Sequence, residues 1–452
     1  MRRNILTAIL TLGLVTSGSA LAEDLLQIYD HAVQSDPVLK QAEQELMATR
    51  ETRPQAMSLL LPNFSLNATG QYQDVKTYNA TKGYLANDDI RGKYSTGSGS
   101  AVLRQTVYNR AQWIGLQQSS DIISQAEATY KTSQIQLMAR TAEAYFEVLR
   151  RADAVRVAEA LMKANERQLE QSRQRFEVGL VAITDVNESQ AAYDASRAEV
   201  INRKNFLDNA WEALRVIIGD VKVTLARLGD NLPLTPPEPN NIDEWTKVAL
   251  QNSFDIQAAS EAVAVAKKQI EIERSGHYPS LGLQAGYEVD RSDSNRFGNE
   301  ADAGYIGLTI NVPIYQGGAV TSRTRQAGYS LSAAQEQLDQ VRRKVIQGVT
   351  DAFRGVISSI SEVEARKAAV VSATSSFEST QAGLEVGTRT QVDVLTEQRK
   401  LYEAEYQYLS ARYDYILNGI RLFRSTSGLT REVLERGNTW LNAKDLVAPP
   451  TT

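Results

Sequence analysis

The sequence has no cysteine, only two histidines and no apolar run of about 20 residues, the length that a membrane-spanning helix needs. The lack of cysteine excludes disulfides, thiolate metal sites, a catalytic cysteine and a lipidated N-terminal cysteine. A mean hydropathy of −0.34 argues against a multi-pass helical membrane protein. Eleven prolines and 27 glycines among 452 residues are too few for a disordered or collagenous chain.

Few residues could support catalysis. His31 and His277 are the only histidines, and we expect each to lie on a helix surface or near a helix end. The sequence has no nucleophile motif, no glycine-rich phosphate loop and no metal-ligand cluster. Asp185 and Asp393 could be cast as an acid and base pair, but nothing else supports that reading. We therefore expect a protein that is not an enzyme and that uses no cofactor and no metal.

The N-terminus indicates export. Arg2 and Arg3 precede an apolar run of eleven residues, Ile5–Val15, and Ala20-Leu21-Ala22 is a small-residue cleavage pattern. This order predicts a signal peptide over residues 1–22, cleaved after Ala22. The mature chain then has 47 basic and 54 acidic residues, a net charge of −7. An acidic, exported, cysteine-free chain is typical of a bacterial envelope protein and is a poor candidate for binding nucleic acid.

The sequence contains an internal duplication. Short matching segments recur in the same order, 207 to 217 residues apart. A stiff proline-rich linker at residues 233–242 separates the copies, which occupy residues 23–232 and 243–428, and a C-terminal tail covers residues 429–452. The matching segments are Leu61-Pro62-Asn63-Phe64 with Tyr278-Pro279-Ser280-Leu281, Val107-Tyr108 with Ile314-Tyr315, Val178-Gly179 with Val386-Gly387, and Asp185-Val186 with Asp393-Val394.

Each copy predicts the same order of elements. A helix is followed by two strands, a very long helix, a tight glycine turn and a shorter helix. The expected helices cover about Leu25–Leu60, Asn109–Phe176 and Asp185–Ile217 in the first copy, and about Asp243–His277, Gly318–Leu384 and Asp393–Ser425 in the second.

The long helices carry coiled-coil periodicity. Apolar residues step by three and four from Ile135 to Ala152, and again from Val349 to Val363. A helix of about 68 residues would be roughly 100 Å long, about the combined length of the two shorter helices in one copy. This pattern predicts a wall of one continuous helix beside two stacked shorter ones, although a helical hairpin in an ordinary bundle has the same periodicity.

The strands alternate apolar and polar residues. The four segments, at about 63–74, 95–107, 281–290 and 303–313, have the length of tilted strands that cross a bilayer. Alternation alone also fits a half-buried sheet, but the signal peptide and the long helices favour an outer-membrane barrel. Four strands cannot close a barrel, so two or three copies must assemble. The polar segments Val75–Arg91 and Asp290–Ala301 would be the external loops.

Three motifs resemble the TolC family of outer-membrane channels. They are the strings Arg175–Val186 and Val386–Leu395, which resemble the two periplasmic turns of the family, and Val312–Gly318, which resembles its last strand-to-helix junction. The resemblance implies a mixed α and β fold: a homotrimer in which a twelve-stranded barrel in the outer membrane continues into a periplasmic barrel of twelve helices, with the C-terminal tail also periplasmic. It places the protein in the outer-membrane lipid of a Gram-negative bacterium.

The resemblance also implies function. The expected protein is a passive exit duct for tripartite efflux and type I secretion. Inner-membrane transporters of the RND, ABC or MFS class would recruit it through periplasmic adaptor (membrane fusion) proteins. Drugs, amphiphiles and unfolded secreted proteins would be its cargo.

The family closes its periplasmic end with polar links between helical hairpins. The resemblance implies that Arg389 bonds to Thr184 and Asp185. The tyrosine that usually joins this network is Leu384 here, so one link is missing.

An acidic ring at the constriction is also implied. By threefold symmetry Asp393 should form it. The second acidic position of the family is Thr396, and Glu397 points about 100° further round the helix. We expect weaker block by multivalent cations and easier opening. A plainer reading makes Asp185 and Asp393 N-caps, with Asp185 and Glu188 as a capping box, and capping is compatible with gating.

The two turns are the expected adaptor-docking tips. Val178-Gly179-Leu180 and Val386-Gly387-Thr388 place apolar residues at turns that should be exposed. The glycines could simply permit a turn with positive φ. The main alternative for the whole chain is a non-conducting trimeric coiled-coil protein of the envelope. A lipid-anchored duct of the same fold is a narrower alternative, but it would need a cysteine after the signal peptide, and this sequence has none.

Overall fold

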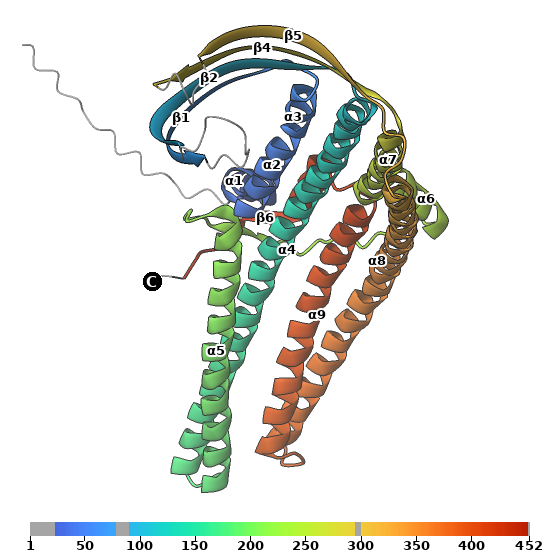
Figure 1. Ribbon diagram of the computed structural model, residues 1–452. Coiled ribbons are helices and arrows are strands. Elements are labelled where there is room, and N and C mark those ends of the chain that lie inside the picture. The colour runs from blue at the N-terminus through green and yellow to red at the C-terminus, as the bar shows by residue number, and fades with distance from the viewer. Residues whose placement is uncertain (1–22, 78–89, 294–299, 451–452) are drawn as a thin grey trace, which may run out of the picture. The chain divides into compact units, whose positions relative to one another are not determined.

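A computed structural model describes residues 23–77, 90–293 and 300–450 (Figure 1). The predicted signal peptide and most of the first external loop lie outside these residues. The chain forms two compact units, and each unit draws segments from both sequence copies. One contains the residues up to Lys40, Ser133–Ser253 and those from Val345 onward. The other contains Gln41–Thr132 and Phe254–Lys344.

The second unit contains an antiparallel sheet of four strands. Its order is β1 (Asn63–Thr77), β2 (Ile90–Tyr108), β4 (Ser280–Ser292) and β5 (Ala301–Asn311). All four strands lie where the alternation predicts them. The central pairing joins β2 of the first copy to β4 of the second, so the duplication meets in the middle of the sheet. The outer sides of β1 and β5 have no strand partner in the described part of the chain.

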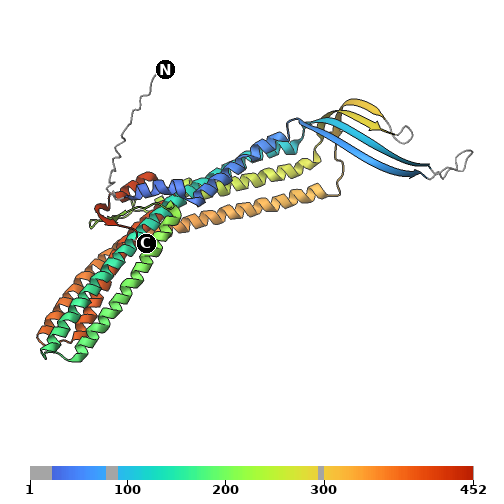
Figure 2. The ribbon, with the colours of Figure 1, turned by 90° about the vertical axis from the view of Figure 1, so that its left-hand side faces the viewer.

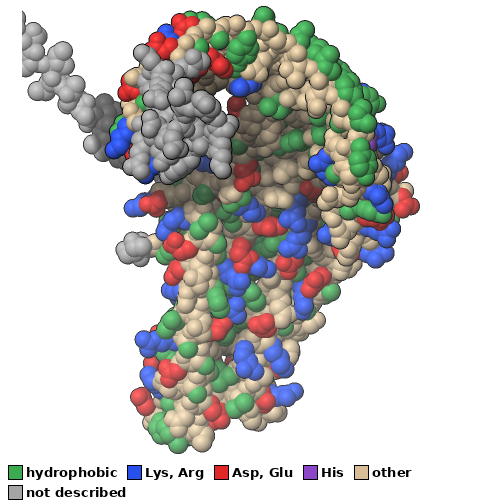
Figure 3. All heavy atoms as spheres, in the orientation of Figure 1, with side chains coloured by type: hydrophobic (Ala, Val, Ile, Leu, Met, Phe, Trp, Pro, Cys, Tyr) green, Lys and Arg blue, Asp and Glu red, His purple; other side chains and the backbone are tan. Residues whose placement is uncertain are grey.

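The two faces of the sheet differ sharply. The register aligns apolar side chains of all four strands on one face and polar side chains on the other. Figure 3 shows hydrophobic side chains along the outside of the curved sheet, where β4 and β5 lie. The exposed apolar set includes Phe64, Leu66, Tyr72, Leu103, Tyr287, Ile306, Leu308 and Ile310, and the opposite face carries Asn67, Thr69, Ser98, Ser100, Gln284 and Thr309.

The first predicted helix is not continuous. It is divided into α1 (Leu25–Ser35), α2 (Pro37–Arg50) and α3 (Thr52–Ser58). Asp36 is extended, with ψ 118°, because the following proline ring disfavours the helical conformation of the residue before it. The buried Asp36 carboxylate then accepts the backbone N–H groups of Val38 and Leu39 and pairs with Arg140 at 2.5 Å.

The equivalent helix of the second copy is also divided. It forms α6 (Ile242–Asn252), α7 (Phe254–Arg274) and a short 3₁₀ turn, η1 (Ser275–His277). Ser253 makes the break with the same extended backbone, ψ 120°, but without a proline. Both expectations of one long helix at the start of each copy were therefore wrong.

The long helices match the prediction closely. They are α4 (Arg110–Glu177) and α8 (Ala319–Glu385), followed by α5 (Ile183–Ile218) and α9 (Gln391–Ser425). In the first unit α4 with α5, and α8 with α9, form two antiparallel hairpins (Figure 2). The predicted seam residues Ala142, Tyr145, Leu149 and Val349 are fully buried. No helix in the described ranges is long and apolar enough to span a membrane.

The tail is more structured than the sequence indicates. It contains α10 (Arg431–Asn438) and β6 (Leu441–Val447), and β6 pairs with β3 (Leu225–Leu228) from the first copy. Beside this small sheet the buried Asp153 carboxylate accepts hydrogen bonds from Tyr413 at 2.7 Å and Arg227 at 2.5 Å. Burial among these groups raises the pKa of Tyr413 well above its usual value.

Candidate functional site

The site is at the ends of the two hairpins, where the glycine turns lie. Gly179 and Gly387 both have φ of 77°, as the alternative reading of these glycines predicts. The N–H of Leu180 donates to the Arg175 carbonyl, and the N–H of Thr388 donates to the Gly383 carbonyl, both at 2.8 Å. The two turns therefore end their helices in the same way.

The turns expose apolar side chains. Val178, Leu180 and Val386 are 69%, 74% and 74% exposed. Thr388 is exposed too, and its hydroxyl donates to the Gly383 carbonyl at 3.1 Å. Both turns therefore present apolar side chains to solvent in the single chain.

The start of α9 holds Asp393 in place. Thr390 is the N-cap, and Asp393 is the third residue of the helix. The Asp393 carboxylate accepts the Thr390 N–H and hydroxyl, both at 2.9 Å, while the Thr390 hydroxyl accepts the Asp393 N–H. These hydrogen bonds lower the pKa of Asp393 below its usual value, so it remains ionised in mild acid. Asp393 is thus part of a capping box, but not as the N-cap that the sequence suggests.

The start of α5 has a different cap. Ala182 is the N-cap and makes no side-chain capping bond. Asp185 lies in the first turn, where it accepts a hydrogen bond from the Thr184 hydroxyl at 3.4 Å. The expectation that Asp185 is an N-cap in a capping box with Glu188 was wrong, because α5 begins at Ile183 rather than after Asp185.

Arg389 lies over the last turn of α8. Its Cγ would be 2.7 Å from a Cβ added at Gly383, so the glycine makes room for the arginine stem. Within the single chain, over the ranges the structure covers, no hydrogen bond or ion pair joins Arg389 to Thr184 or Asp185. Its positive charge instead helps lower the pKa of Asp393 and Glu397. Leu384, in place of the expected tyrosine, is half-buried and offers no hydrogen bond.

Thr396 and Glu397 do not join Asp393. The Glu397 carboxylate accepts from Lys400 at 2.7 Å and from Ser376 of α8 at 2.9 Å, and these bonds lower its pKa. Thr396 lines a groove of about 570 Å³ between α4, α5 and α9. The floor of the groove is rich in alanine, including Ala158 and Ala192. Asp393, Thr396 and Glu397 therefore have separate surroundings in the single chain.

A buried polar network, which the sequence pattern does not predict, joins the two hairpins. The Gln391 amide of α9 donates to the Ser189 hydroxyl of α5 at 3.2 Å and accepts from Gln168 of α4 at 3.1 Å. The Ser189 and Ser172 hydroxyls are 3.0 Å apart. Ser172, Ser189 and Gln391 are all buried, so each needs its partner.

A second link lies two turns along α9. The Gln398 amide donates to the Asn165 side-chain oxygen at 2.7 Å, and Asn165 donates to the Ala192 carbonyl at 3.1 Å. Both side chains are buried. The available signal was polar residues at positions that a coiled coil normally fills with apolar ones, a pattern that specifies register.

The two histidines lie away from this site. His31 is on the surface of α1, 3.2 Å from Glu23, and His277 is exposed in the 3₁₀ turn after α7. Both therefore lie where the sequence predicts. No group of three or more metal-ligating side chains occurs in the portion of the chain described by the structure.

Solved structures share this fold. A CusC structure superposes with a TM-score of 0.75 at 16% identity and covers 90% of this chain and 93% of its own. The VceC outer membrane protein of Vibrio cholerae gives 0.72 at 18% identity, with 89% and 96% covered. The fold is that of the outer-membrane channels built from long helices and a four-stranded sheet per chain.

Sequence relatives identify the family. The family described as outer membrane efflux protein matches residues 28–220 and 245–428. The outer membrane protein TolC of Salmonella enteritidis is 35% identical over 97% of this chain and 91% of the relative, and that of Vibrio cholerae is 35% identical over 95% and 97%. The alkaline protease secretion protein AprF of Pseudomonas aeruginosa is 26% identical over 89% and 84%. The chain belongs to the outer membrane efflux protein family.

The protein is therefore an outer-membrane channel for export. Its family and relatives are channels rather than enzymes.

Proposed function

We propose that three copies of this chain form a passive exit duct, with a twelve-stranded barrel in the outer membrane and twelve helices around a periplasmic tunnel. This proposal rests on the two open edges of the sheet, at β1 and β5. Unpaired backbone groups are not tolerated in lipid, and a membrane barrel needs about eight strands or more. Three sheets joined edge to edge, β5 of one copy to β1 of the next, satisfy both requirements.

The two faces of the sheet fit a barrel wall. The apolar face meets lipid and the polar face lines a watery lumen. In the sheet register Tyr72 lies toward one end of the apolar face, Tyr108 lies beside Leu281 at the other, and Tyr287 is level with Leu66 between them. Tyr72 and Tyr108 thus occupy the places of the two aromatic girdles of an outer-membrane barrel. At about 3.3 Å per residue, the eight steps from Leu281 to Val289 cover roughly 26 Å along the strand, or roughly 20 Å of height at a tilt of about 40°, close to a barrel's apolar band.

The helical tips form the periplasmic gate. Three Asp393 carboxylates form the acidic ring, while Thr396 and Glu397 stay out of it. Arg389 bonds to Thr184 and Asp185 of a neighbouring copy, because within the described residues of one chain Arg389 bonds to neither of them. The Gln391 network keeps each pair of hairpins together in the closed state.

The exposed tips recruit the rest of the export machinery. Val178, Gly179 and Leu180, with Val386, Gly387 and Thr388, form the surface for a periplasmic adaptor protein. The adaptor connects the duct to an inner-membrane transporter of the RND, ABC or MFS class. Relatives named for protease secretion and for antibiotic efflux support a duct that serves both unfolded proteins and drugs.

Crosslinking tests the assembly. The chain has no cysteine, so engineered pairs need no background removal. N67C on β1 is combined in turn with G307C, T309C and N311C on β5. Oxidation in outer membranes should give species of two and three chain masses for at least one pair, and only monomer for each single variant. Monomer for every pair, with the protein folded, would overturn the proposed barrel.

A further inference from the structure

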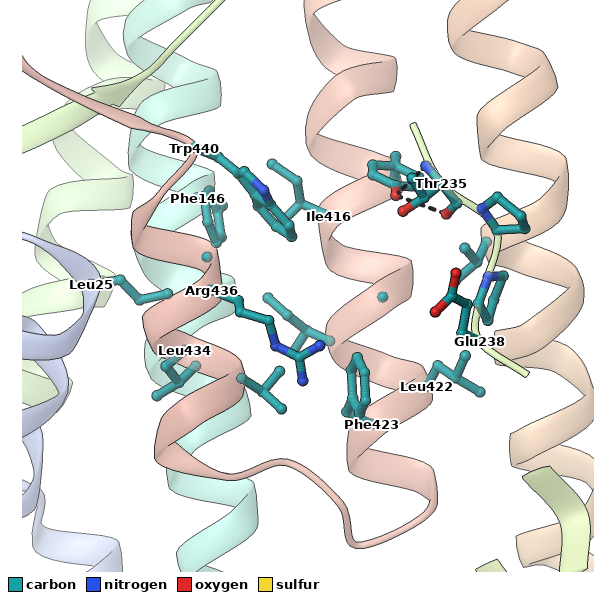
Figure 4. A pocket seen from close by; sticks show the side chains of 18 of the residues that line it. Leu25, Phe146, Thr235, Glu238, Ile416, Leu422, Phe423, Leu434, Arg436 and Trp440 are labelled. Atoms are coloured by element: carbon teal, nitrogen blue, oxygen red, sulfur yellow. Dashed lines mark hydrogen bonds between the residues drawn. The ribbon is translucent and has the colours of Figure 1, made fainter. Parts of the chain in front are cut away.

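A cavity of about 310 Å³ lies in the first unit, away from the hairpin tips (Figure 4). Its walls come from α1, α4, α6, α8, α9 and α10 and from the proline-rich linker. Aromatic rings dominate the lining. Phe146 of α4, Trp245 of α6, Phe423 of α9 and Trp440 after α10 all face it, and the Trp245 and Phe423 rings meet edge to face with centroids 5.6 Å apart.

One unpaired cation accompanies these rings. Figure 4 shows Arg436 reaching from α10 toward Phe423, and its guanidinium carbon is 5.7 Å from the ring centroid. Arg436 has no ion-pair partner over the ranges that the structure covers. Its helix neighbour Arg431 differs, since it pairs with Asp30 at 2.6 Å. The Phe423 ring thus holds the Arg436 guanidinium at the cavity without neutralising its charge.

The only carboxylate among the lining residues is Glu238. It comes from the linker, on the other side of the cavity from Arg436 in Figure 4, and it is exposed to solvent. No ion pair joins it to Arg436. Arg436 and Glu238 are both exposed to solvent, but only Arg436 is held against an aromatic ring of the lining. The apolar interior and this cation therefore define the binding chemistry of the cavity.

We propose that this cavity binds a small anionic amphiphile. Its apolar body packs against Trp245, Trp440 and Phe146, and its carboxylate, sulfonate or phosphate group pairs with Arg436. An apolar pocket of this size with one convergent polar group is typical of small-molecule sites. A ligand there would bridge the linker, α9 and α10.

Fluorescence quenching tests the site in the full-length protein. The variants W113F and W211F are combined, so that Trp245 and Trp440 remain as reporters. The protein is held in nanodiscs of phosphatidylcholine and titrated with 8-bromooctanoate, with 8-bromooctanol and 8-bromooctylammonium as neutral and cationic matches. We expect saturable quenching by 8-bromooctanoate, with an apparent Kd at least tenfold lower than that of the neutral or the cationic match.

Three variants locate the binding. R436Q should weaken binding of the anion at least tenfold. K444Q, which removes a charge outside the cavity, should leave this binding unchanged. G419L should abolish saturable quenching by filling the cavity. A Cβ at Gly419 meets no atom within 4 Å, and leucine favours a helix, so this variant should keep its thermal stability. Equal binding of the three ligands, or unchanged binding by R436Q or by G419L, would overturn the proposal.

Discussion

Gln391 of α9 donates a hydrogen bond to Ser189 of α5 at 3.2 Å, although 202 residues separate them in the chain. Each residue belongs to a different sequence copy and a different hairpin. Both are buried, and Gln391 also accepts from Gln168. This contact means that one hairpin cannot move against the other without exposing or orphaning polar groups.

Removing the Gln391 amide should therefore ease opening. In Q391L, Ser189 and Gln168 lose a buried partner, which costs roughly 1–3 kcal/mol in the closed state. We expect about a tenfold rise in the open population, since 1.4 kcal/mol is a factor of ten. Single-channel recordings measure it. Q174A removes an exposed amide that bonds only to Glu170, so its open population should equal that of the wild type. A Q391L channel that opens no more often than the wild type would contradict the role of the network.

The Asp393 ring should govern block by multivalent cations. Because the pKa of Asp393 is lowered, its charge is present at neutral pH and is lost only as pH falls through that lowered value, below its usual range near 4. Block should thus persist at pH 5, and D393N should abolish it at every pH. E397Q should change block little, because Lys400 and Ser376 already hold that carboxylate. Block that survives in D393N would rule out the ring.

Adaptor docking should depend on the exposed tips rather than on turn stability. V386D adds a charge at a side chain that is 74% exposed, so it should abolish adaptor crosslinking without lowering Tm. G387A should instead cost about 1–2 kcal/mol, because alanine is strained at φ of 77°. G328A, a helical glycine with open space around it, should not destabilise the protein. If V386D crosslinks to the adaptor as well as the wild type does, Val386 is not part of the docking surface.

The buried Asp153 should be the most sensitive charge in the first unit. D153A removes the acceptor of the buried Tyr413 hydroxyl and the closer of the two carboxylates on Arg227, and should cost about 3–5 kcal/mol. D445A removes the other carboxylate on Arg227, but Asp445 is half exposed, so its loss should cost about 1 kcal/mol or less. Thermal unfolding of the two variants measures the difference. Equal Tm values would show that burial does not set the strength of these pairs.

The sequence predicts the regular parts of this fold well. Long helices and alternating strands depend on local periodicity, so α4, α8 and the four sheet strands lie within a few residues of expectation. The divisions at Asp36 and Ser253 were missed because the apolar pattern continues across them. The short β3 and β6 were missed because their partners lie far away in the chain: each strand pairs with the other, and β3 also bridges to Glu23.

The candidate site was only partly predictable. Gly179 and Gly387 are local signals, so the tips could be located from the sequence. The partners of Gln391 and Gln398 lie in the other sequence copy, and only the packed hairpins bring them together. The turning of Glu397 toward Ser376 likewise depends on the packing of α9 against α8.

Planar-bilayer recording of the purified full-length protein tests the central claim most directly. A gated trimeric duct predicts that the wild type conducts but is mostly closed, that the open population of Q391L is about tenfold higher, and that D393N loses multivalent-cation block. A folded, trimeric protein that conducts no current in either form would contradict the account and would favour a non-conducting coiled-coil protein of the envelope.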